Sequence, residues 1–526
     1  MKSLILLISL LLITVIDTFA QDGAPDPAFG GGDGMVLHTI TNNEKSWGYG
    51  VAVQPDQKIV VTGNTIGYDG YEQPFLARYQ EDGMLDSSFN GNGKVLLDLS
   101  AEHSYGRAVR IQPDGKIVLC AESDDSTGKK IWVLRFNEDG TPDASFDIDG
   151  LAKIIVKSKY LGVKALALQA DNKIVVGGYL GGLARDSFFI ARFLSNGMLD
   201  NSFDGDGFTH TIVGEDYINV GALLVQPDNK IIAVGYARFG GNDDMTLVRY
   251  NDNGTLDNSF SGDGIAHIKF SDGDDSANSG LIQPDGKIVV AGYAINDANG
   301  KKDFAIARFN PDGTLDDSFQ GNGMTLIHIT EFSDAAYTLL RQPDGKYLMG
   351  GLAHSETAAG GSALALARLN ENGTFDNTFD DDGIFSLIHP GISTVIFSAA
   401  MQPDGKIISA GTFNDGGINQ VMLFRTLTGL TTATHDVEEV VAEVSLYPNP
   451  VSEILVLKYS LQKTEQLQIT LCDVMGRKID QLLNQQERHA GNHEELLKLN
   501  KAFSPGLYFV KMETGRGVKV IPIVKE

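Results

Sequence analysis

Short apolar runs, separated by turns rich in Gly, Asp and Asn, recur along most of the chain. The clearest example is residues 281–293, where two apolar runs flank the sequence Gln283-Pro284-Asp285-Gly286-Lys287. Asp-Gly between apolar runs is typical of a β-hairpin, because both central positions of a type I′ turn need positive φ and these residues tolerate it. The pattern therefore predicts a hairpin with a type I′ turn.

This hairpin sequence is repeated along the chain, starting at Gln54, Gln112, Gln169, Gln226, Gln283, Gln342 and Gln402. Within the fifth unit the pattern predicts four strands, at residues 265–270, 279–283, 287–293 and 304–309. No stretch of the array has sustained helical periodicity. Four antiparallel strands in each of seven units predict an all-β, seven-bladed β-propeller over residues 21–427, and a linear β-solenoid is the alternative.

A second pattern runs between the units. Each predicted fourth strand carries an Arg, and in six units an Asp follows eight residues later and a Phe three residues after that, as in Arg78, Asp86 and Phe89. We expect the Asp to accept hydrogen bonds from the Arg or from turn amides, and the Phe to anchor the crossing into the next blade. The functional alternative is a ring of seven arginines that binds an anion.

The seventh unit lacks this Asp. Its arginine, Arg425, is followed by Ala433 at the eighth position, but Asp26 and Phe29 near the N-terminus have the same spacing of three. We therefore predict that Asp26 and Phe29 fill the empty place beside Arg425. The two ends of the chain would then lock the last blade to the first without exchange of a strand.

The repeat stops after residue 427. Residues 428–443 are Thr-rich and then acidic, which predicts an exposed linker. Residues 444–526 return to short alternating strands and predict a small Ig-like β-sandwich. Its most distinctive short sequences contain Pro448, Asn449 and Pro450, then Gly476 and Arg477, then Gly491 and His493, and finally Gly506.

The N-terminus has the features of an export signal. Lys2 precedes an apolar run over residues 4–16, and Thr18-Phe19-Ala20 offers small residues for cleavage before Gln21, so residues 1–20 are predicted to be a signal peptide. The run is too short to cross a bilayer, and no other run approaches that length, so no transmembrane segment is predicted.

Net charge and cysteine content exclude some classes of partner and of covalent cross-link. The 526 residues carry a formal net charge of -26, which argues against nucleic acids, because these bind basic faces. Only Cys120 and Cys472 are present, in different predicted domains, so no disulfide framework is expected.

Two resemblances follow from these motifs. The sequence from Gln283 to Gly292, then Ala307-Arg308-Phe309, then Gly313-Thr314-Leu315-Asp316, resembles the delta-60 repeat, a β-propeller family of secreted bacterial proteins. The C-terminal short sequences resemble the type A sorting domain of the type IX secretion system of Bacteroidota-type bacteria. This second resemblance implies handling by the type IX machinery through residues 444–526, passage through the periplasm, and release or attachment at the outer-membrane surface.

Two groups of residues are candidate metal ligands. Asp200, Asp204 and Asp206 have the spacing of the start of a calcium loop, although turn formation explains the same residues and no Glu follows at the twelfth position. Four histidines, namely His38, His210, His267 and His328, occupy similar places in the predicted first strands. If those strands lined the central channel, the histidines would converge there, and the alternative is a polar face that is repeated by duplication. Apart from possible calcium, no cofactor is predicted.

The sequence contains no nucleophile elbow, zinc-protease motif or phosphate loop, and no catalytic residue is assigned. We therefore expect a secreted binding or interaction scaffold for extracellular polymers or proteins. The alternative is a propeller hydrolase or lyase that acts on extracellular polysaccharide. Converging carboxylates about 5 to 9 Å apart would favour the enzyme. The variable turns at residues 294–303 and 353–362 share one rim and are expected to contribute to binding.

Overall fold

The computed structural model describes residues 22–525, except residues 43–44, 68–69, 100–102, 126–127, 157, 183–184, 355–360, 389–390, 430–440, 448–450, 462, 473–477, 500–505 and 515–516. The predicted signal peptide and most of the predicted linker lie outside the described residues, as do Pro448, Asn449, Pro450, Gly476 and Arg477. Within the described part, no helix has the length and apolarity needed to cross a membrane.

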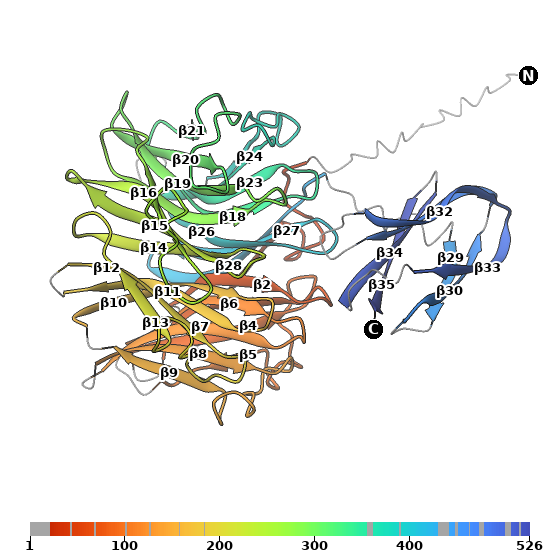
Figure 1. Ribbon diagram of the computed structural model, residues 1–526, viewed down its shortest axis with the longest axis horizontal. Coiled ribbons are helices and arrows are strands. Elements are labelled where there is room, and N and C mark those ends of the chain that lie inside the picture. The colour runs from red at the N-terminus through yellow and green to blue at the C-terminus, as the bar shows by residue number, and fades with distance from the viewer. Residues whose placement is uncertain are drawn as a thin grey trace, which may run out of the picture.

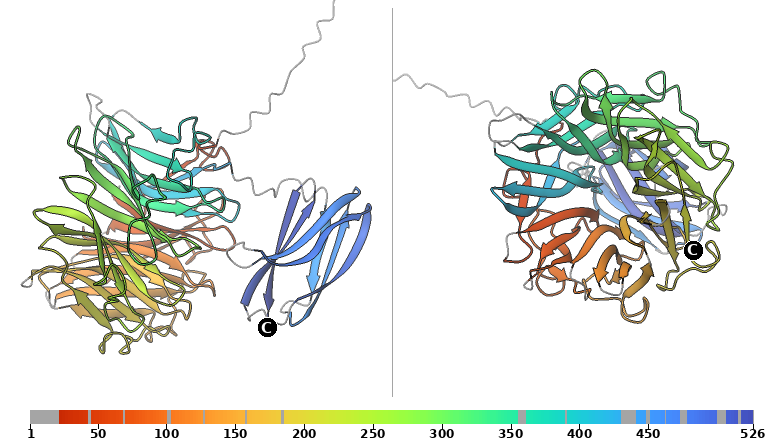
Figure 2. Two further views of the ribbon diagram at one scale, coloured as in Figure 1. Left: turned by 45° about the horizontal axis from the view of Figure 1, so that its top comes forward. Right: turned by 90° about the vertical axis from the view of Figure 1, so that its left-hand side faces the viewer.

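The strands of the repeat array fold into blades around a central axis (Figures 1 and 2). Blade 1 contains β2 (Ser46–Val53), β3 (Ile59–Ile66), β4 (Glu72–Tyr79) and β5 (Lys94–Leu96). Blade 2 contains β6 (His103–Ile111), β7 (Ile117–Asp125), β8 (Gly128–Phe136) and β9 (Leu151–Val156). Blade 3 contains β10 (Tyr160–Leu168), β11 (Ile174–Gly181), β12 (Ser187–Phe193) and β13 (Phe208–Thr211). Blade 4 contains β14 (Ile218–Val225), β15 (Ile231–Phe239), β16 (Asn242–Tyr250) and β17 (Ile265–Ile268).

The remaining blades have the same plan. Blade 5 contains β18 (Asp275–Ile282), β19 (Ile288–Asn296), β20 (Lys301–Phe309) and β21 (Met324–Ile327). Blade 6 contains β22 (Asp334–Arg341), β23 (Tyr347–His354), β24 (Ser362–Leu369) and β25 (Ile384–Leu387). Blade 7 contains β26 (Ile392–Met401), β27 (Ile407–Asp415), β28 (Ile418–Thr426) and, from the other end of the chain, β1 (Met35–His38). A single bridge between Ser362 and Ser393 joins the last two blades. The array is thus an all-β, seven-bladed propeller.

The order of strands within a blade differs from the prediction. The strand predicted to open the fifth unit is β17, and it pairs with β16 as the outer strand of blade 4. The inner strand of each blade is instead the one that leads into the Gln-Pro-Asp-Gly-Lys hairpin. The repeat period is the same in either arrangement, so the period alone could not place the boundary between blades.

The ring closes by exchange of a strand, so the prediction of closure without exchange is wrong. Strand β1 pairs antiparallel with β28, and Met35 lies opposite Phe424 while His38 lies opposite Val421. In every other blade the outer strand follows its own Arg-Asp-Phe sequence, and β1 likewise follows Phe29. The N-terminal segment therefore supplies the outer strand of blade 7 as well as Asp26 and Phe29.

The hairpin turns also differ from the predicted type I′ turn. Gly286 has φ of 85°, but Asp285 is not among the described residues with positive φ. The Gly286 amide donates to the Gln283 carbonyl at 2.9 Å, and the Gln283 amide donates to the Lys287 carbonyl at 2.8 Å. This is a three-residue loop in which a type I turn precedes a left-handed Gly. Pro284 explains the choice, because its fixed φ suits the first central position of a type I turn.

This turn geometry predicts opposite effects at two equivalent positions. Gly286→Val should lower stability by about 1 kcal/mol or more, because a β-branched residue resists positive φ. Gln57 occupies the same place in blade 1 with φ of 68°, so Gln57→Gly should instead raise stability by up to about 1 kcal/mol. Thermal unfolding of the two variants beside the wild type measures both. Shifts in the same direction would contradict the assigned turn.

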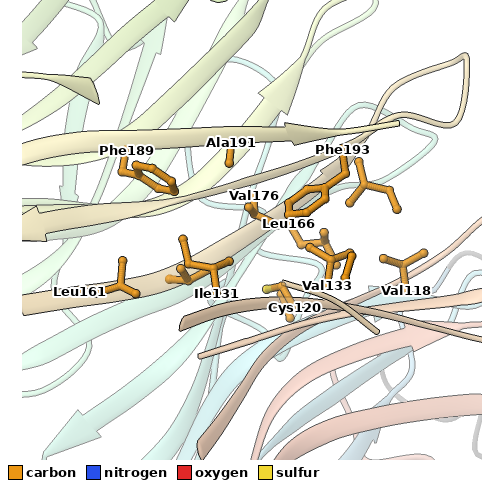
Figure 3. Close-up of a cluster of buried hydrophobic side chains, with 14 of the residues drawn as sticks. Val118, Cys120, Ile131, Val133, Leu161, Leu166, Val176, Phe189, Ala191 and Phe193 are labelled. Carbon is orange, nitrogen blue, oxygen red and sulfur yellow. The ribbon is translucent and has the colours of Figure 1, made fainter. Parts of the chain in front are cut away.

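The core of the propeller lies between neighbouring blades. Figure 3 shows Val118, Cys120, Ile131 and Val133 from blade 2 packed against side chains of blade 3, all almost completely buried. Each strand second in its blade is apolar along most of its length, because both of its faces are covered by adjacent blades. Burial raises the pKa of the Cys120 thiol to about 12, so this cysteine is an inert core residue.

The C-terminal domain contains two antiparallel sheets with their own core. One sheet contains β29 (Val441–Tyr447), β30 (Ile454–Leu461) and β33 (Gly491–Lys498). The other contains β31 (Glu465–Cys472), β32 (Lys478–Arg488), β34 (Gly506–Thr514) and β35 (Gly517–Lys525). Side chains such as Leu457, Ile469 and Val510 from both sheets are buried together. The predicted Gly506 begins β34, where it lies opposite Lys525.

Candidate functional site

The seven inner strands enclose a central channel. A cavity of 480 Å³ is lined by residues from β2, β6, β10, β14, β18, β22 and β26, one strand from each blade. Ligand sites in proteins are usually concave and of comparable size. The channel is therefore the first place to look for chemistry.

Each inner strand has a β-bulge at the same place in the repeat, five residues before the hairpin Gln. The ladder skips one residue in each pairing between an inner strand and its neighbour. The skipped residues all line the channel: Tyr49, Arg107, Lys164, Gly221, Asn278, Tyr337 and Phe397. A bulge leaves one residue outside the ladder and can redirect its side chain, a device common beside active sites. Here it presents one position per blade to the channel.

The side chains at the bulges differ between blades, whereas several other positions of the repeat are constant. The hairpin Gln and the Arg of the third strand are identical in all seven units. The bulged positions instead hold aromatic, cationic, amide and glycine residues. The hairpin Gln and the joint Arg are therefore constant within this chain, whereas the bulged position, which faces the channel, differs from blade to blade.

Blades 2 and 3 contribute positive charge. Arg107, Arg110 and Lys164 line the channel, and the latter two are exposed to it. Desolvation by the surrounding wall lowers the pKa of Lys164, and the charge on Arg107 lowers it further. Desolvation also lowers the pKa of Arg110.

A buried carboxylate behind the wall holds Arg107 in place. The Arg107 Nε donates to Glu122 Oε1 at 3.0 Å, and the other oxygen of Glu122 accepts from the Val163 amide at 2.7 Å. Burial alone would lower the pKa of Arg107, but Glu122 reverses this and leaves that pKa raised. Glu122 thus neutralises one cation of the channel and fixes the backbone next to Lys164.

Blades 6, 7 and 1 contribute aromatic rings. The ring centroid of Phe397 lies 5.2 Å from that of Tyr49 and 5.5 Å from that of Tyr337, with tilted planes. The Arg107 guanidinium lies 5.8 Å from the Tyr49 centroid, so the aromatic and cationic parts of the wall adjoin. All three rings are half-buried, which leaves area for contact with a ligand.

The repeated arginines lie away from the channel, at the joints between blades. In blade 1 the Arg78 Nε donates to Asp86 Oδ2 at 2.7 Å, and the guanidinium carbon lies 4.8 Å from the Phe89 centroid. A Cβ added at Gly140, in a turn of the next blade, would meet the Phe89 ring at 2.7 Å. Arg78 Nη1 also donates to the carbonyl of Glu138 in that blade. These residues therefore join one blade to the next.

The same joint occurs in all seven blades. The Arg Nε to Asp Oδ2 distances are 2.6 to 2.8 Å, and the guanidinium-to-Phe distances are 4.5 to 4.8 Å. At the closure Arg425 Nε lies 2.7 Å from Asp26 Oδ2, and its guanidinium lies 4.6 Å from the Phe29 centroid. Because every one of these arginines is buried and paired, none is available as part of an anion-binding ring.

The candidate calcium ligands have other partners. Asp200 pairs with Arg192 at 2.8 Å, and its other oxygen accepts from the amide and hydroxyl of Ser202. The carboxylate of Asp206 accepts from the Phe208 amide at 3.3 Å. Asp204 has φ of 52° and its amide donates to Asn253. The joint between blades explains why Asp200 is present, and turn formation explains Asp204 and Asp206.

The histidines do not line the channel, so the predicted convergence is wrong. His38, His210 and His267 lie on the outer strands β1, β13 and β17, and His328 follows the outer strand β21. The error follows directly from assigning these strands to the inside of a blade. His328 Nδ1 lies 3.0 Å from Asp303 Oδ1, and with Asp334 they form the one group of metal-type ligands found among the described residues. Asn296 and the residue 329–330 amides already donate to these carboxylates.

The channel residues were missed by the sequence analysis. A signal was present, because the position five residues before each hairpin Gln varies in chemistry where its neighbours do not. The sequence pattern places this strand second in its unit, so it does not identify the strand as the one that lines the channel.

Comparisons with known proteins cover both domains. A model described as a domain of unknown function (DUF5122) β-propeller matches residues 54–89, 112–146, 169–203, 226–260, 283–319, 342–379 and 402–428. A model of the secretion system C-terminal sorting domain matches residues 445–526. A search of curated proteins found no significant match.

Several solved structures match this chain at low identity and low TM-score. An ulvan lyase of a polysaccharide lyase family, bound to a glucuronate–sulfated rhamnose unit, is 14% identical with a TM-score of 0.42, over 80% of this chain and 98% of its own. The polysaccharide lyase Uly1 is 12% identical with a TM-score of 0.41, over 72% and 90%. The β-propeller domain of the Trilobed protease from Pyrococcus furiosus is 10% identical with a TM-score of 0.39, over 74% and 98%.

Proposed function

Because the chain belongs to the DUF5122 β-propeller family and ends in a type IX C-terminal sorting domain, we propose that it is an exported binding protein whose central channel receives an extracellular ligand. The sorting domain indicates secretion and export to the cell surface. Passage through the periplasm after removal of residues 1–20 is part of the proposal.

The ring of bulged residues carries this proposal. A propeller that needed only to be stable could keep one residue at all seven bulges, as it does at the joints between blades. Instead this chain presents different chemistry from each blade at one level of the channel. A small set of polar groups in a partly apolar cavity is the usual form of a ligand site.

Binding is favoured over hydrolysis by the composition of the channel wall. Among the described lining residues there is no Asp or Glu, and Glu122, which contacts the lining residue Arg107, is paired with it. Hydrolysis of a glycosidic bond generally needs two carboxyl groups on either side of it. The site as described offers cations and aromatic rings in their place.

A second candidate is a lyase, and the lowered pKa of Lys164 favours it. In a uronate chain, a neutral amine could take the proton at C5 while Arg110 stabilises the adjacent carboxylate. The C4–O bond would break, the departing oxygen would take up a proton, and a double bond would remain between C4 and C5. Ultraviolet absorbance of an unsaturated product would distinguish this activity from binding.

An array experiment tests the binding function. The chain from Gln21 onward should be applied to glycan and protein arrays, with and without calcium, beside the variants Phe397→Ala and Lys301→Ala. We expect a ligand that the wild type and the exposed rim variant Lys301→Ala retain and that the channel variant loses. A ligand lost with Lys301→Ala but retained with Phe397→Ala would place binding on the rim and contradict the proposal.

A further inference from the structure

The charge within the channel is opposite to that of the whole protein. The chain has a formal net charge of -26, yet the described lining of the channel contains three cations and no carboxylate. A cleft with one sign of charge and low-dielectric walls concentrates ions of the other sign. Anions repelled by most of the surface would therefore be attracted at this one place.

Two of the three cations lack a carboxylate partner. Arg107 is neutralised by Glu122, but Arg110 Nη1 donates to the backbone carbonyl of Val109 at 2.9 Å. No hydrogen bond or ion pair is found for Lys164 among the described residues. Desolvation by the channel wall lowers the pKa of both residues, and the charge of Glu122 offsets this only in part for Lys164. An anion bound beside either cation would offset this cost.

The aromatic side chains of the channel wall set a second requirement for the ligand. Phe397 lies between Tyr49 and Tyr337, and these rings come from three consecutive blades beside the cationic blades. Aromatic rings bind apolar ring faces, while the Tyr hydroxyls remain available for hydrogen bonds. A ligand that fills this channel must therefore combine an anionic group, an apolar face and hydroxyl groups.

We propose that the ligand is an acidic saccharide, with its carboxylate or sulfate against the cationic side chains of blades 2 and 3 and its sugar ring against Phe397 and the two tyrosines. This inference rests on the proposed function and specifies its ligand class. Sugars present apolar C–H faces together with hydroxyl groups, and uronate or sulfated units add the anion. Nucleic acid, the other common anionic polymer, is disfavoured by the negative charge of the rest of the surface.

Calorimetric titration of the full chain with three probes tests the ligand class. The probes are an oligogalacturonate, a sulfated galactose oligosaccharide and a neutral maltooligosaccharide. The first two arms distinguish a carboxylate from a sulfate, and inorganic sulfate alone tests for a simple anion site. We expect an acidic probe to bind, to bind more weakly at high salt, and to bind more tightly than the neutral probe or free sulfate.

Matched variants identify the residues involved. Lys164→Gln and Arg110→Gln should each weaken binding of the acidic probe by roughly tenfold or more, whereas Lys164→Arg should retain most of the affinity. Phe397→Ala should weaken the binding of any saccharide. Thermal unfolding of each variant shows whether the fold is intact, and Lys301→Ala serves as a charge-matched control outside the channel.

The outcomes separate this inference from the proposed function. If the neutral probe binds as tightly as the acidic ones and only Phe397→Ala weakens it, the channel is a binding site but the acidic class is wrong. If free sulfate binds as tightly as the acidic oligosaccharides, the saccharide part is wrong. If folded Phe397→Ala binds an acidic probe as the wild type does, both the inference and the channel site are refuted.

Discussion

A chain that lacks residues 440–526 should no longer appear outside the cell. The sorting domain occupies these residues, and without it the type IX machinery has no segment to engage. We expect the truncated protein to accumulate in the periplasm while the full chain appears at the surface or in the medium. Fractionation followed by immunoblotting measures this directly, and loss of nearly all export is the expected size of the effect.

The propeller itself should survive this deletion. The buried clusters of the propeller contain residues 29–424, whereas the C-terminal cluster contains residues 444–523, and none of them mixes the two domains. A domain with its own core is expected to fold alone. Circular dichroism of the truncated protein should therefore give a folded β spectrum. Normal appearance of this folded chain in the medium would contradict the assignment of the export signal.

The parts of the fold that the sequence predicted well are local and repeated. Seven copies of one hairpin identified the propeller, and the constant spacing of Arg78, Asp86 and Phe89 predicted a contact that the structure places between blades. Such spacing is visible because each joint needs the same side chains. One such hairpin sequence is weak evidence for a fold, but seven copies at a regular period are strong evidence for a repeat architecture.

The errors concern choices that local sequence leaves open. Nothing in β17 alone states whether it pairs with the blade before it or the blade after it, and that one misplacement also moved His267 from the outside to the channel. Asp285-Gly286 alone predicts a type I′ turn, but Pro284 before it has a fixed φ that favours a type I turn. The channel itself arises only when seven distant strands converge, so Lys164 and Phe397 could be recognised only by comparing the same position across repeats.

The closure of the ring is the place where loss of a short segment should cost the most stability. Deletion of residues 21–38 removes β1, Asp26 and Phe29 together. The outer edge of β28 then loses its partner strand, and Arg425 remains buried without its carboxylate. Breaking a buried ion pair from one side costs about 3 to 5 kcal/mol, and loss of a buried Phe costs a similar amount. We expect a large fall in melting temperature, or failure to fold.

Single substitutions measure how much of this loss of stability comes from the ion pair between Asp26 and Arg425. The pKa of Asp26 would be raised by burial, but the Ala28 amide, Arg425 and Lys406 outweigh this and lower it, so the native state holds the charged form. Asp26→Asn should therefore destabilise the propeller by about 3 kcal/mol or more. Asp316→Asn removes the same contact from Arg308 inside the array and is the matched control.

The comparison of these two variants tests how the ring is held. The pairs have nearly equal geometry, at 2.7 Å for Arg425 to Asp26 and 2.6 Å for Arg308 to Asp316. Blades 5 and 6 are also connected by the chain itself, whereas the N-terminal segment and β28 are held together only by non-covalent contacts. Opening at the closure can therefore expose both edges of the ring at once, and Asp26→Asn should also increase amide hydrogen exchange along β28. Equal exchange in the two variants, or a 21–38 deletion without loss of stability, would show that β1 does not hold the ring closed.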